Sequence, residues 1–321
     1  MKIASLFSGY DSALIALEHL NISYELMFWS EIDPIAITAH NNILPGCKDK
    51  NIGDITSSII PNTKLDILVY TPPCQDLSRA GKMNGAKKAS NTRSSLLWES
   101  EKIIRATTPG TLIMEEVPTL LSVFKNTLKE WINTLSKLGY TSIPVVFNTA
   151  DFGIPHNRKR LYLISTLDRP PQLELLIQKS KPKPITDFLD PLEHTPNNLW
   201  INKDIPNIRI EEGINERPII LGHSRNYTHP ERSNYHQKKL VSTITTKNCY
   251  PPTTLLYYDK HKIRRLSHIE RARLQGLSDA DITKLFNNLT PTSCNKLIGN
   301  ALSINVIQNI LLKIIHHEKD N

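Results

Sequence analysis

The chain has 321 residues, with 39 Lys and Arg against 31 Asp and Glu, so its formal net charge is +8 at pH 7. Its 39% hydrophobic and 22% charged residues are ordinary for a folded protein and exclude a mainly disordered one. No apolar run reaches the roughly 18–20 residues that a membrane helix needs, and the N-terminus lacks a signal-peptide pattern, so we expect a cytoplasmic protein with no membrane span.

The cysteines and the excess of basic over acidic residues further limit the classes of protein to which this chain can belong. None of Cys47, Cys74, Cys249 and Cys294 lies in a Cys-x-x-Cys pair, and no His/Cys cluster has zinc spacing. The sequence therefore predicts neither a disulfide framework nor a metal site. The positive charge favours a polyanionic partner such as nucleic acid, although charge alone also serves solubility.

In the first half of the chain, short apolar runs alternate with helix-like stretches. Strands are predicted at residues 3–7, 27–29, 65–70, 111–114, 145–148 and 160–165, and helices at 12–20, 34–41, 96–106 and 120–138. This alternation predicts an α/β fold with a parallel sheet and helices on both of its faces.

The pattern changes in the second half. Clustered prolines between residues 169 and 196 indicate linker and loop. Residues 197–260 show little helical periodicity and are rich in Asn, His, Tyr, Lys and Thr, which predicts a second, smaller, irregular β-rich module. Helical patterns return at 267–274 and 303–316.

Cys74 follows two prolines after the predicted strand 65–70. Open α/β folds place ligands at the carboxyl ends of their strands, and prolines before a thiol stiffen the loop that carries it. Two interpretations stay open from these residues alone, a nucleophile and a small apolar residue in a turn.

Two acids, Glu115 and Glu116, directly follow the predicted strand 111–114. A carboxyl group buried there would have a raised pKa and could donate a proton at neutral pH. An acid pair at a helix start, favoured by the helix dipole, is the alternative.

Residues 6–12 turn from a strand into a helix around Gly9, and Glu31 follows the next strand about twenty residues on. With Asp54 at a further strand end, these positions suggest a site for a nucleoside cofactor. A plain α/β domain could also show all of these features.

These segments and others, in this order, resemble the motifs of the cytosine-C5 DNA methyltransferase family. The segments are Phe7-Ser8-Gly9, Glu31-Ile32-Asp33, Gly53-Asp54-Ile55, Pro73-Cys74-Gln75, Glu115-Glu116-Val117, and the ranges 154–160, 264–276 and 297–301. The match spans residues 3–307 and is interrupted mainly at about 178–260, where the family carries its variable target-recognition region.

The resemblance implies an S-adenosyl-L-methionine-dependent DNA (cytosine-5)-methyltransferase with a Rossmann-like fold. It implies a catalytic and cofactor-binding domain at 1–177 plus 291–321 and a target-recognition domain at 178–290. The implied cofactor contacts are Phe7, Ser8, Gly9, Tyr10, Asp11, Ser12, Glu31, Ile32, Asp54, Ile55, Pro72, Asn300 and Ala301. The implied partner is double-stranded DNA, bound by a monomer that works beside a cognate restriction endonuclease or protects phage or host DNA.

In the chemistry that the resemblance implies, the Cys74 thiolate adds to cytosine C6 and so activates C5 toward a sulfonium methyl group. Glu115 would donate a proton at cytosine N3, Arg160 would hold O2, and Arg158 would support the same loop. The base must first flip out of the duplex. The implied DNA contacts are Gln75, Ser78, Arg79, Lys82, Arg225, Lys238, Lys239 and Thr245.

The chain departs from the family's pattern at a few positions. Asp11 and Ser12 stand where the family has glycines, Glu116 where it has Asn, and His156 where it has Gln. Two alternatives remain: a tRNA cytosine-5 methyltransferase, whose typical Cys-Phe-Thr segment this sequence lacks, and a catalytically impaired DNA-binding relative.

Overall fold

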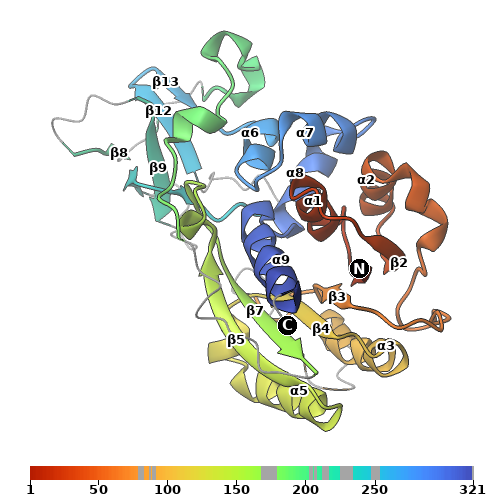
Figure 1. Ribbon diagram of the computed structural model, residues 1–321. Helices are drawn as coiled ribbons and strands as arrows, with labels where there is room; N and C mark the ends of the chain where they lie inside the picture. Colours follow the sequence, from red (N-terminus) through yellow and green to blue (C-terminus); the bar gives the residue numbers. More distant parts are fainter. Residues whose placement is uncertain are drawn as a thin grey trace. The chain divides into compact units, whose positions relative to one another are not determined.

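The computed structural model in Figure 1 describes residues 1–78, 83–86, 88, 92–167, 179–201, 205, 208–211, 217–224, 234–246 and 254–319. The chain forms two compact units: the first unit is residues 1–148, 159–178 and 306–321, and the second unit is residues 149–158 and 179–305. The predicted domains have a similar discontinuous layout. They differ because residues 149–158 and 291–305, expected in the catalytic domain, group with the second unit.

One six-stranded sheet forms the centre of the first unit. Its strands are β1 (Lys2–Leu6), β2 (Glu25–Ser30), β3 (Ile67–Tyr70), β4 (Thr111–Glu116), β5 (Thr141–Asn148) and β7 (Lys159–Thr166), in the order β2-β1-β3-β4-β7-β5. The predicted strands are all present, and the α/β class is confirmed.

The expectation of a wholly parallel sheet is wrong for β7. Strands β1 to β4 pair in parallel, whereas β7 is antiparallel to both β4 and β5. A parallel connection requires a crossover of a dozen or more residues, usually a helix. Residues 149–158, which join β5 to β7, contain only the short 3-10 turn η3 (Thr149–Asp151) and the two-residue strand β6, so β7 returns antiparallel beside β5.

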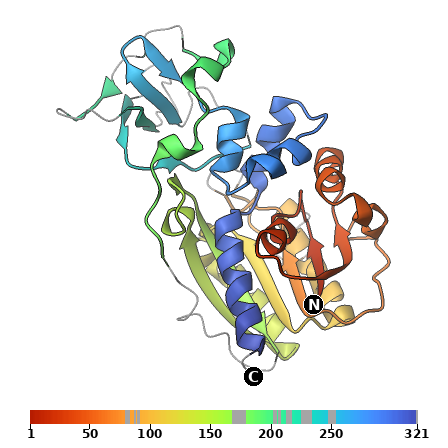
Figure 2. The same ribbon diagram turned by 45° about the horizontal axis from the view of Figure 1, so that its top comes forward.

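Helices cover both faces of this sheet. They are α1 (Ser12–His19), α2 (Pro34–Ile43), α3 (Ser100–Thr107), α4 (Thr119–Ser122), α5 (Lys125–Lys137) and α9 (Ile304–Lys319), with the 3-10 helices η1 (Pro45–Lys50) and η2 (Arg93–Glu99). Figures 1 and 2 show α1 and α9 on one face and α3 and α5 on the other. The second face holds a core in which Met114 of β4 and Tyr70 of β3 pack with Trp131 of α5.

Two predicted helices are each divided. The predicted helix 120–138 is α4 followed by α5, with Val123 and Phe124 between them, and 96–106 begins as η2 and continues as α3. Phe124 leaves the helical conformation (φ −107°, ψ 32°) and packs against the core.

The described residues of the second unit form two small sheets and three helices. The larger sheet has the order β13-β12-β9-β10-β8, and the smaller pairs β11 with β6. The strands are β6 (His156–Asn157), β8 (Ile208–Arg209), β9 (Ile219–Ser224), β10 (Asn234–Lys238), β11 (Val241–Ser242), β12 (Thr254–Asp259) and β13 (Lys262–Arg264). The helices are α6 (His268–Arg273), α7 (Asp279–Leu285) and α8 (Pro291–Asn300), with the 3-10 turns η5 (Ile185–Phe188), η6 (Leu192–His194) and η7 (Asn197–Leu199).

Within the described residues, no single helix is long and apolar enough to cross a bilayer, although α8 and α9 together meet a test of length and composition.

Candidate active site

The loop after β1 turns sharply at three positions. Phe7, Gly9 and Asp11 have positive φ angles of 55°, 58° and 65°, a region that Gly and Asp tolerate better than most residues. Asp11 then caps α1, because its carboxylate accepts the Leu14 N–H at 3.3 Å and the Ser5 hydroxyl. Burial raises the pKa of Asp11 to about 6. Asp11 therefore adopts the positive φ angle of this turn at a position where the family has Gly.

The Glu31 carboxylate, at the end of β2, joins this loop to the start of α2. Its Oε2 accepts the Gly9 N–H at 3.0 Å, and its Oε1 accepts the N–H groups of Ile32 at 2.7 Å and Asp33 at 2.9 Å. A carboxylate offers about four acceptor positions, so one remains for a ligand hydroxyl.

Asn51 is a site residue that sequence reasoning missed. Its Oδ1 accepts the N–H groups of Glu31 at 3.2 Å and Gly53 at 3.0 Å, and its Nδ2 donates to the Glu31 carbonyl at 3.2 Å. Ser30 also donates from its hydroxyl to the Gly53 carbonyl at 2.7 Å. These bonds hold the segment that carries Asp54 against the end of β2.

The side chains of the other predicted cofactor residues differ in their exposure to solvent. Ile32 is 61% exposed, and Asp54 is also exposed. Hydrogen bonds from the N–H and hydroxyl of Thr56 hold the pKa of Asp54 below its usual value. The Ile55 side chain is only 3% exposed, so a ligand there would meet its backbone. Ser8 is half-buried, and Tyr10, Ser12 and Pro72 are buried.

Cys74 begins a tight turn just past the carboxyl end of β3. Its thiol is partly buried against the core, and its carbonyl accepts the N–H groups of Leu77 at 3.0 Å and Ser78 at 2.9 Å. Gln75 is exposed, and its side-chain oxygen accepts from Arg93 at 3.1 Å.

Ser94 and Asp76 brace this turn, and no sequence pattern singled them out. The Ser94 hydroxyl donates to the Pro73 carbonyl at 2.6 Å and accepts the Asp76 N–H at 3.1 Å. The buried Asp76 carboxylate accepts from Asn84 at 3.1 Å. Side chains on both sides therefore fix the backbone that carries Cys74.

Glu115 comes to the same edge of the sheet as Cys74. Strands β3 and β4 are parallel neighbours, with Tyr70 opposite Met114. Cys74 follows Tyr70 by four residues, and Glu115 follows Met114 directly. The carboxyl ends of parallel neighbours lie at one edge, where open α/β folds bind ligands.

Glu115 forms an ion pair with Arg160, whose Nε lies 3.0 Å from Glu115 Oε1. The register explains the pair, because Glu115 lies opposite Tyr162 on β7 and Arg160 is two residues before Tyr162. Side chains two apart on a strand share a face. Arg160 also donates to the Lys159 carbonyl at 2.8 Å, which orients the guanidinium.

Glu116 points to the opposite face of β4, where it is 1% exposed. Its Oε2 accepts the Val117 N–H at 2.8 Å, and its Oε1 has no hydrogen-bond partner among the described residues. Burial raises the pKa of Glu116 well above its usual value, and the nearby Glu115 charge adds to the effect. Glu115 is thus in an ion pair at the carboxyl end of β4, and Glu116 is in the core.

In the second unit, the buried Arg158 binds backbone. Its guanidinium donates to the carbonyls of Ile244 at 3.3 Å, Gly299 at 3.3 Å and Ala301 at 2.7 Å. The predicted cofactor residues Asn300 and Ala301 lie at the end of α8 in this unit.

Among the predicted DNA contacts, Lys238 and Lys239 are exposed at the end of β10, and Thr245 is half-buried. Arg79, Lys82 and Arg225 lie outside the described residues.

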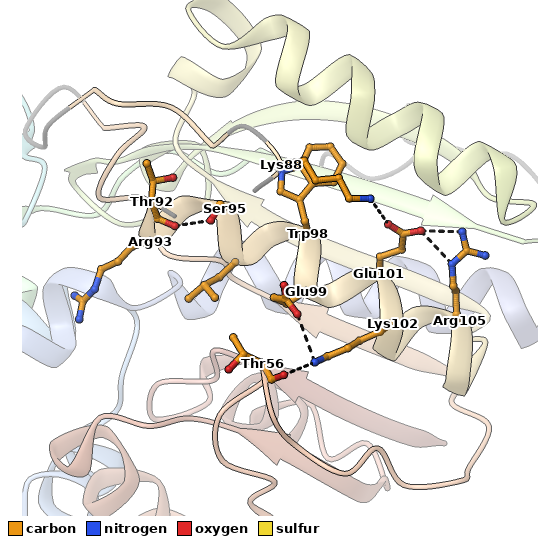
Figure 3. A pocket seen from close by; sticks show the side chains of 11 residues that line it. Thr56, Lys88, Thr92, Arg93, Ser95, Trp98, Glu99, Glu101, Lys102 and Arg105 are labelled. Atoms are coloured by element: carbon orange, nitrogen blue, oxygen red, sulfur yellow. Dashed lines mark hydrogen bonds and ion pairs between the residues drawn. The ribbon is translucent and has the colours of Figure 1, made fainter. Parts of the chain in front are cut away.

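A pocket of about 700 Å³ lies along η2 and α3, lined also by Thr56, Lys88 and Thr92. Figure 3 shows two groups of paired charges in it, with Glu101 between Lys88 and Arg105, and Lys102 between Glu99 and the Thr56 carbonyl. None of the predicted catalytic or cofactor residues lines it.

The described residues contain no group of three or more His, Cys, Asp or Glu placed to hold a metal ion. Cys47, Cys74 and Cys294 are not joined in disulfides, and burial raises the pKa of Cys294 to about 11.

Comparisons with solved structures show the fold. A methyltransferase of Entamoeba histolytica, EhMeth, superposes with a TM-score of 0.71 at 18% identity, covering 99% of this chain and 98% of that one. The Dnmt2 methyltransferase of S. pombe gives 0.70 at 15% identity, with 99% of both chains covered.

Sequence comparisons identify the family. Type II methyltransferase M2.ScrFI of Lactococcus lactis subsp. cremoris is 30% identical over 272 residues, 83% of this chain and 71% of its own. Orphan methyltransferase M.SssI of Spiroplasma monobiae is 31% identical over 293 residues, 86% of this chain and 72% of its own. A family profile described as C-5 cytosine-specific DNA methylase matches residues 1–316. The chain therefore belongs to the C-5 cytosine-specific DNA methylase family.

Proposed function

We propose that the chain methylates C5 of cytosine in double-stranded DNA with S-adenosyl-L-methionine as methyl donor. The observation that supports this most is the pairing of parallel β3 and β4, which brings Cys74 and the Glu115–Arg160 pair to one sheet edge. Membership of a DNA methylase family favours DNA over tRNA as substrate, as does the missing Cys-Phe-Thr segment.

Cys74 supplies the nucleophile in this mechanism. A thiol with an ordinary pKa of about 8.5 is only a few per cent ionised at pH 7. Its addition to the base therefore needs a proton or hydrogen bond at the ring nitrogen N3. As the S–C6 bond forms, the ring electrons move toward N3 and leave C5 nucleophilic. After methylation, loss of the C5 proton and cleavage of the S–C6 bond restore cytosine aromaticity and the free thiol.

Glu115 and Arg160 act on the polar edge of the base. A proton or hydrogen bond from Glu115 at N3 stabilises the charge that develops as Cys74 adds, and this transition-state stabilisation lowers the barrier. Arg160, oriented by the Lys159 carbonyl, supplies donors for O2.

The ends of β1 and β2 and the segment at Asp54 suit a nucleoside cofactor. Ile32 offers an exposed apolar surface for an adenine ring, Asp54 an exposed acceptor for its amino group, and Glu31 a remaining acceptor position for a ribose hydroxyl. S-adenosyl-L-methionine would supply an electrophilic methyl group on a sulfonium.

The biological role that we propose is modification of DNA within a restriction-modification system or in phage or host DNA protection. The relatives named as type II and orphan methyltransferases support this role. The second unit would then act in target recognition, with Lys238 and Lys239 on phosphates.

The test replaces Cys74 by Ala. We expect Cys74→Ala to abolish methyl transfer from labelled cofactor to duplex DNA, while thermal unfolding and DNA binding stay near wild type, because only a small, partly buried thiol is lost. Cys47→Ala is the matched control, since Cys47 is also partly buried in the first unit. The Trp29 ring N–H donates to the backbone carbonyl of Cys47, which the substitution keeps.

Undiminished methyl transfer by Cys74→Ala would refute the mechanism. Bisulfite sequencing of DNA from cells that express the wild type identifies the methylated base and its sequence, and unmethylated cytosine throughout would refute the proposed activity.

A further inference from the structure

His156 stands where the family has Gln, and its ring is fully buried in the second unit. Nδ1 lies 3.1 Å from the Leu274 carbonyl oxygen, and Nε2 lies 3.1 Å from the Ile244 backbone nitrogen. A carbonyl only accepts and a backbone N–H only donates. The ring must therefore be neutral, with its proton on Nδ1 and a lone pair on Nε2.

The bond to Ile244 anchors residues 243–246, which we name the Thr segment. The segment follows β11, which pairs with β6 so that Val241 lies opposite His156. Three further hydrogen bonds hold it: Arg158 donates to the Ile244 carbonyl, Arg271 donates to the Thr245 carbonyl, and the Thr243 hydroxyl donates to the Asn157 carbonyl. Three basic side chains thus hold the backbone of the segment that contains Thr245, a predicted DNA contact.

Protonation would reverse one of these contacts. With a proton on Nε2, two donors would face each other at the 3.1 Å that now separates Nε2 from the Ile244 nitrogen, and the buried Ile244 N–H would lose its acceptor. The ring or the segment would then have to move.

The charged surroundings also disfavour a cationic ring. The titratable groups on the neighbouring helices α6 and α8 are His268, Glu270, Arg271, Arg273, Cys294 and Lys296. Glu270 is already paired with Arg264, and Arg273 with Asp190 and Asp279. Arg158 and Arg271, held at the Thr segment itself, would repel a third positive charge there.

We propose that His156 is a positioning residue that fixes the Thr segment for DNA only while its ring is neutral, so that acid weakens DNA recognition. The inference rests on the proposed function. A Gln side chain carries the same donor and acceptor pair without a titratable proton, so His156→Gln should keep the anchor and lose its pH dependence.

The experiment measures the Kd for a duplex of the methylated sequence by fluorescence anisotropy from pH 8 to pH 5 at fixed ionic strength. At pH 8 we expect wild type and His156→Gln to bind equally, and His156→Leu to bind about tenfold more weakly because the Ile244 N–H loses its acceptor. As the pH falls, wild type should approach His156→Leu while His156→Gln does not. His261→Gln, at an exposed histidine of the same unit, should follow wild type and so controls for general histidine titration.

Parallel pH curves for wild type and His156→Gln, or wild-type binding by His156→Leu, would overturn the inference. A second readout needs no DNA: the Ile244 amide should exchange with solvent faster in His156→Leu than in His156→Gln, and equal exchange would also overturn it. A wild type that neither binds nor methylates DNA at pH 8 would refute the proposed function instead, and the exchange measurement would still test the anchor. If His156→Leu does not fold, the comparison of wild type with His156→Gln decides the question alone.

Discussion

At the scale of single residues, neighbouring Glu115 and Glu116 occupy opposite environments because successive side chains on β4 point to opposite faces. Glu115 meets Arg160, whereas Glu116 faces the core with one oxygen lacking a partner among the described residues. Burial raises the pKa of the Glu116 carboxyl well above the usual 4.5, so this carboxyl holds its proton to higher pH than an exposed glutamate does. A neutral carboxyl offers one donor, which Asn offers at the same position in the family.

The protonation of Glu116 makes stability depend on pH. Because the folded-state pKa is raised, the unfolded chain loses this proton first as the pH rises through 4.5, and stability then falls by about 1.4 kcal/mol per pH unit up to the folded-state pKa. We expect Glu116→Gln to be more stable than wild type at pH 7 and to lose that advantage below about pH 4. Urea unfolding over a pH series checks this, with Glu130→Gln at an exposed position of α5 as control. If the difference in unfolding free energy between Glu116→Gln and wild type does not change with pH, Glu116 is ionised in the folded protein.

Activity should distinguish the two acids. Glu115→Gln removes the group that we assign to N3, and general acid–base groups are worth roughly 10²–10⁴-fold in rate. Glu116→Gln should keep or raise activity near pH 7, because it supplies a neutral side chain with donors. Methyl transfer to duplex DNA over a pH series measures both. If Glu115→Gln is active and Glu116→Gln is inactive, the catalytic acid is Glu116 and the motif has been aligned one residue too early.

At the scale of elements, local pattern predicted each strand of the main sheet, because buried strands are continuous apolar runs. Apolar runs alone do not give the direction of β7, but the short connection between β5 and β7 leaves no room for a parallel crossover, so the spacing of the predicted strands indicates an antiparallel pair. Local pattern could not predict Asn51 or Ser94, whose hydrogen bonds reach backbone groups about twenty residues away in the chain. The ordered motifs single out Cys74 and Glu115 as candidates, but only the register between β4 and β7 explains why Arg160 meets Glu115.

The packing of α8 gives a prediction about one glycine. A Cβ at Gly299 would overlap backbone atoms of Thr245 and Thr246, which cannot move aside as a flexible side chain can. We expect Gly299→Ala to destabilise the protein by roughly 1–3 kcal/mol despite the better helix propensity of Ala. Gly46→Ala is the matched control, because its Cβ would meet no atom within 4 Å. Thermal unfolding measures both, and a Gly299→Ala variant as stable as Gly46→Ala would contradict this packing.

At the scale of the whole molecule, the basic residues behind the net charge of +8 would act on the proposed DNA binding in two ways that experiment can separate. Long-range attraction depends on total charge and falls with salt screening. Direct phosphate contacts release bound counterions, so the slope of log K against log salt steepens by about 0.9 for each phosphate neutralised. Only residues at the interface change that slope strongly.

Lys238 and Lys239 are exposed together at the end of β10 and are the described cations that we assign to phosphates. The double variant Lys238→Ala/Lys239→Ala should bind all duplexes more weakly and flatten the salt slope by about 2, because two phosphate contacts are lost, with no change in preferred sequence. Lys129→Ala/Lys137→Ala, on exposed positions of α5, removes the same charge and should leave the slope nearly unchanged. Titrations of a labelled duplex at several salt concentrations give both slopes. Equal flattening by the two variants would mean that Lys238 and Lys239 act only through net charge and that the phosphate contacts lie elsewhere.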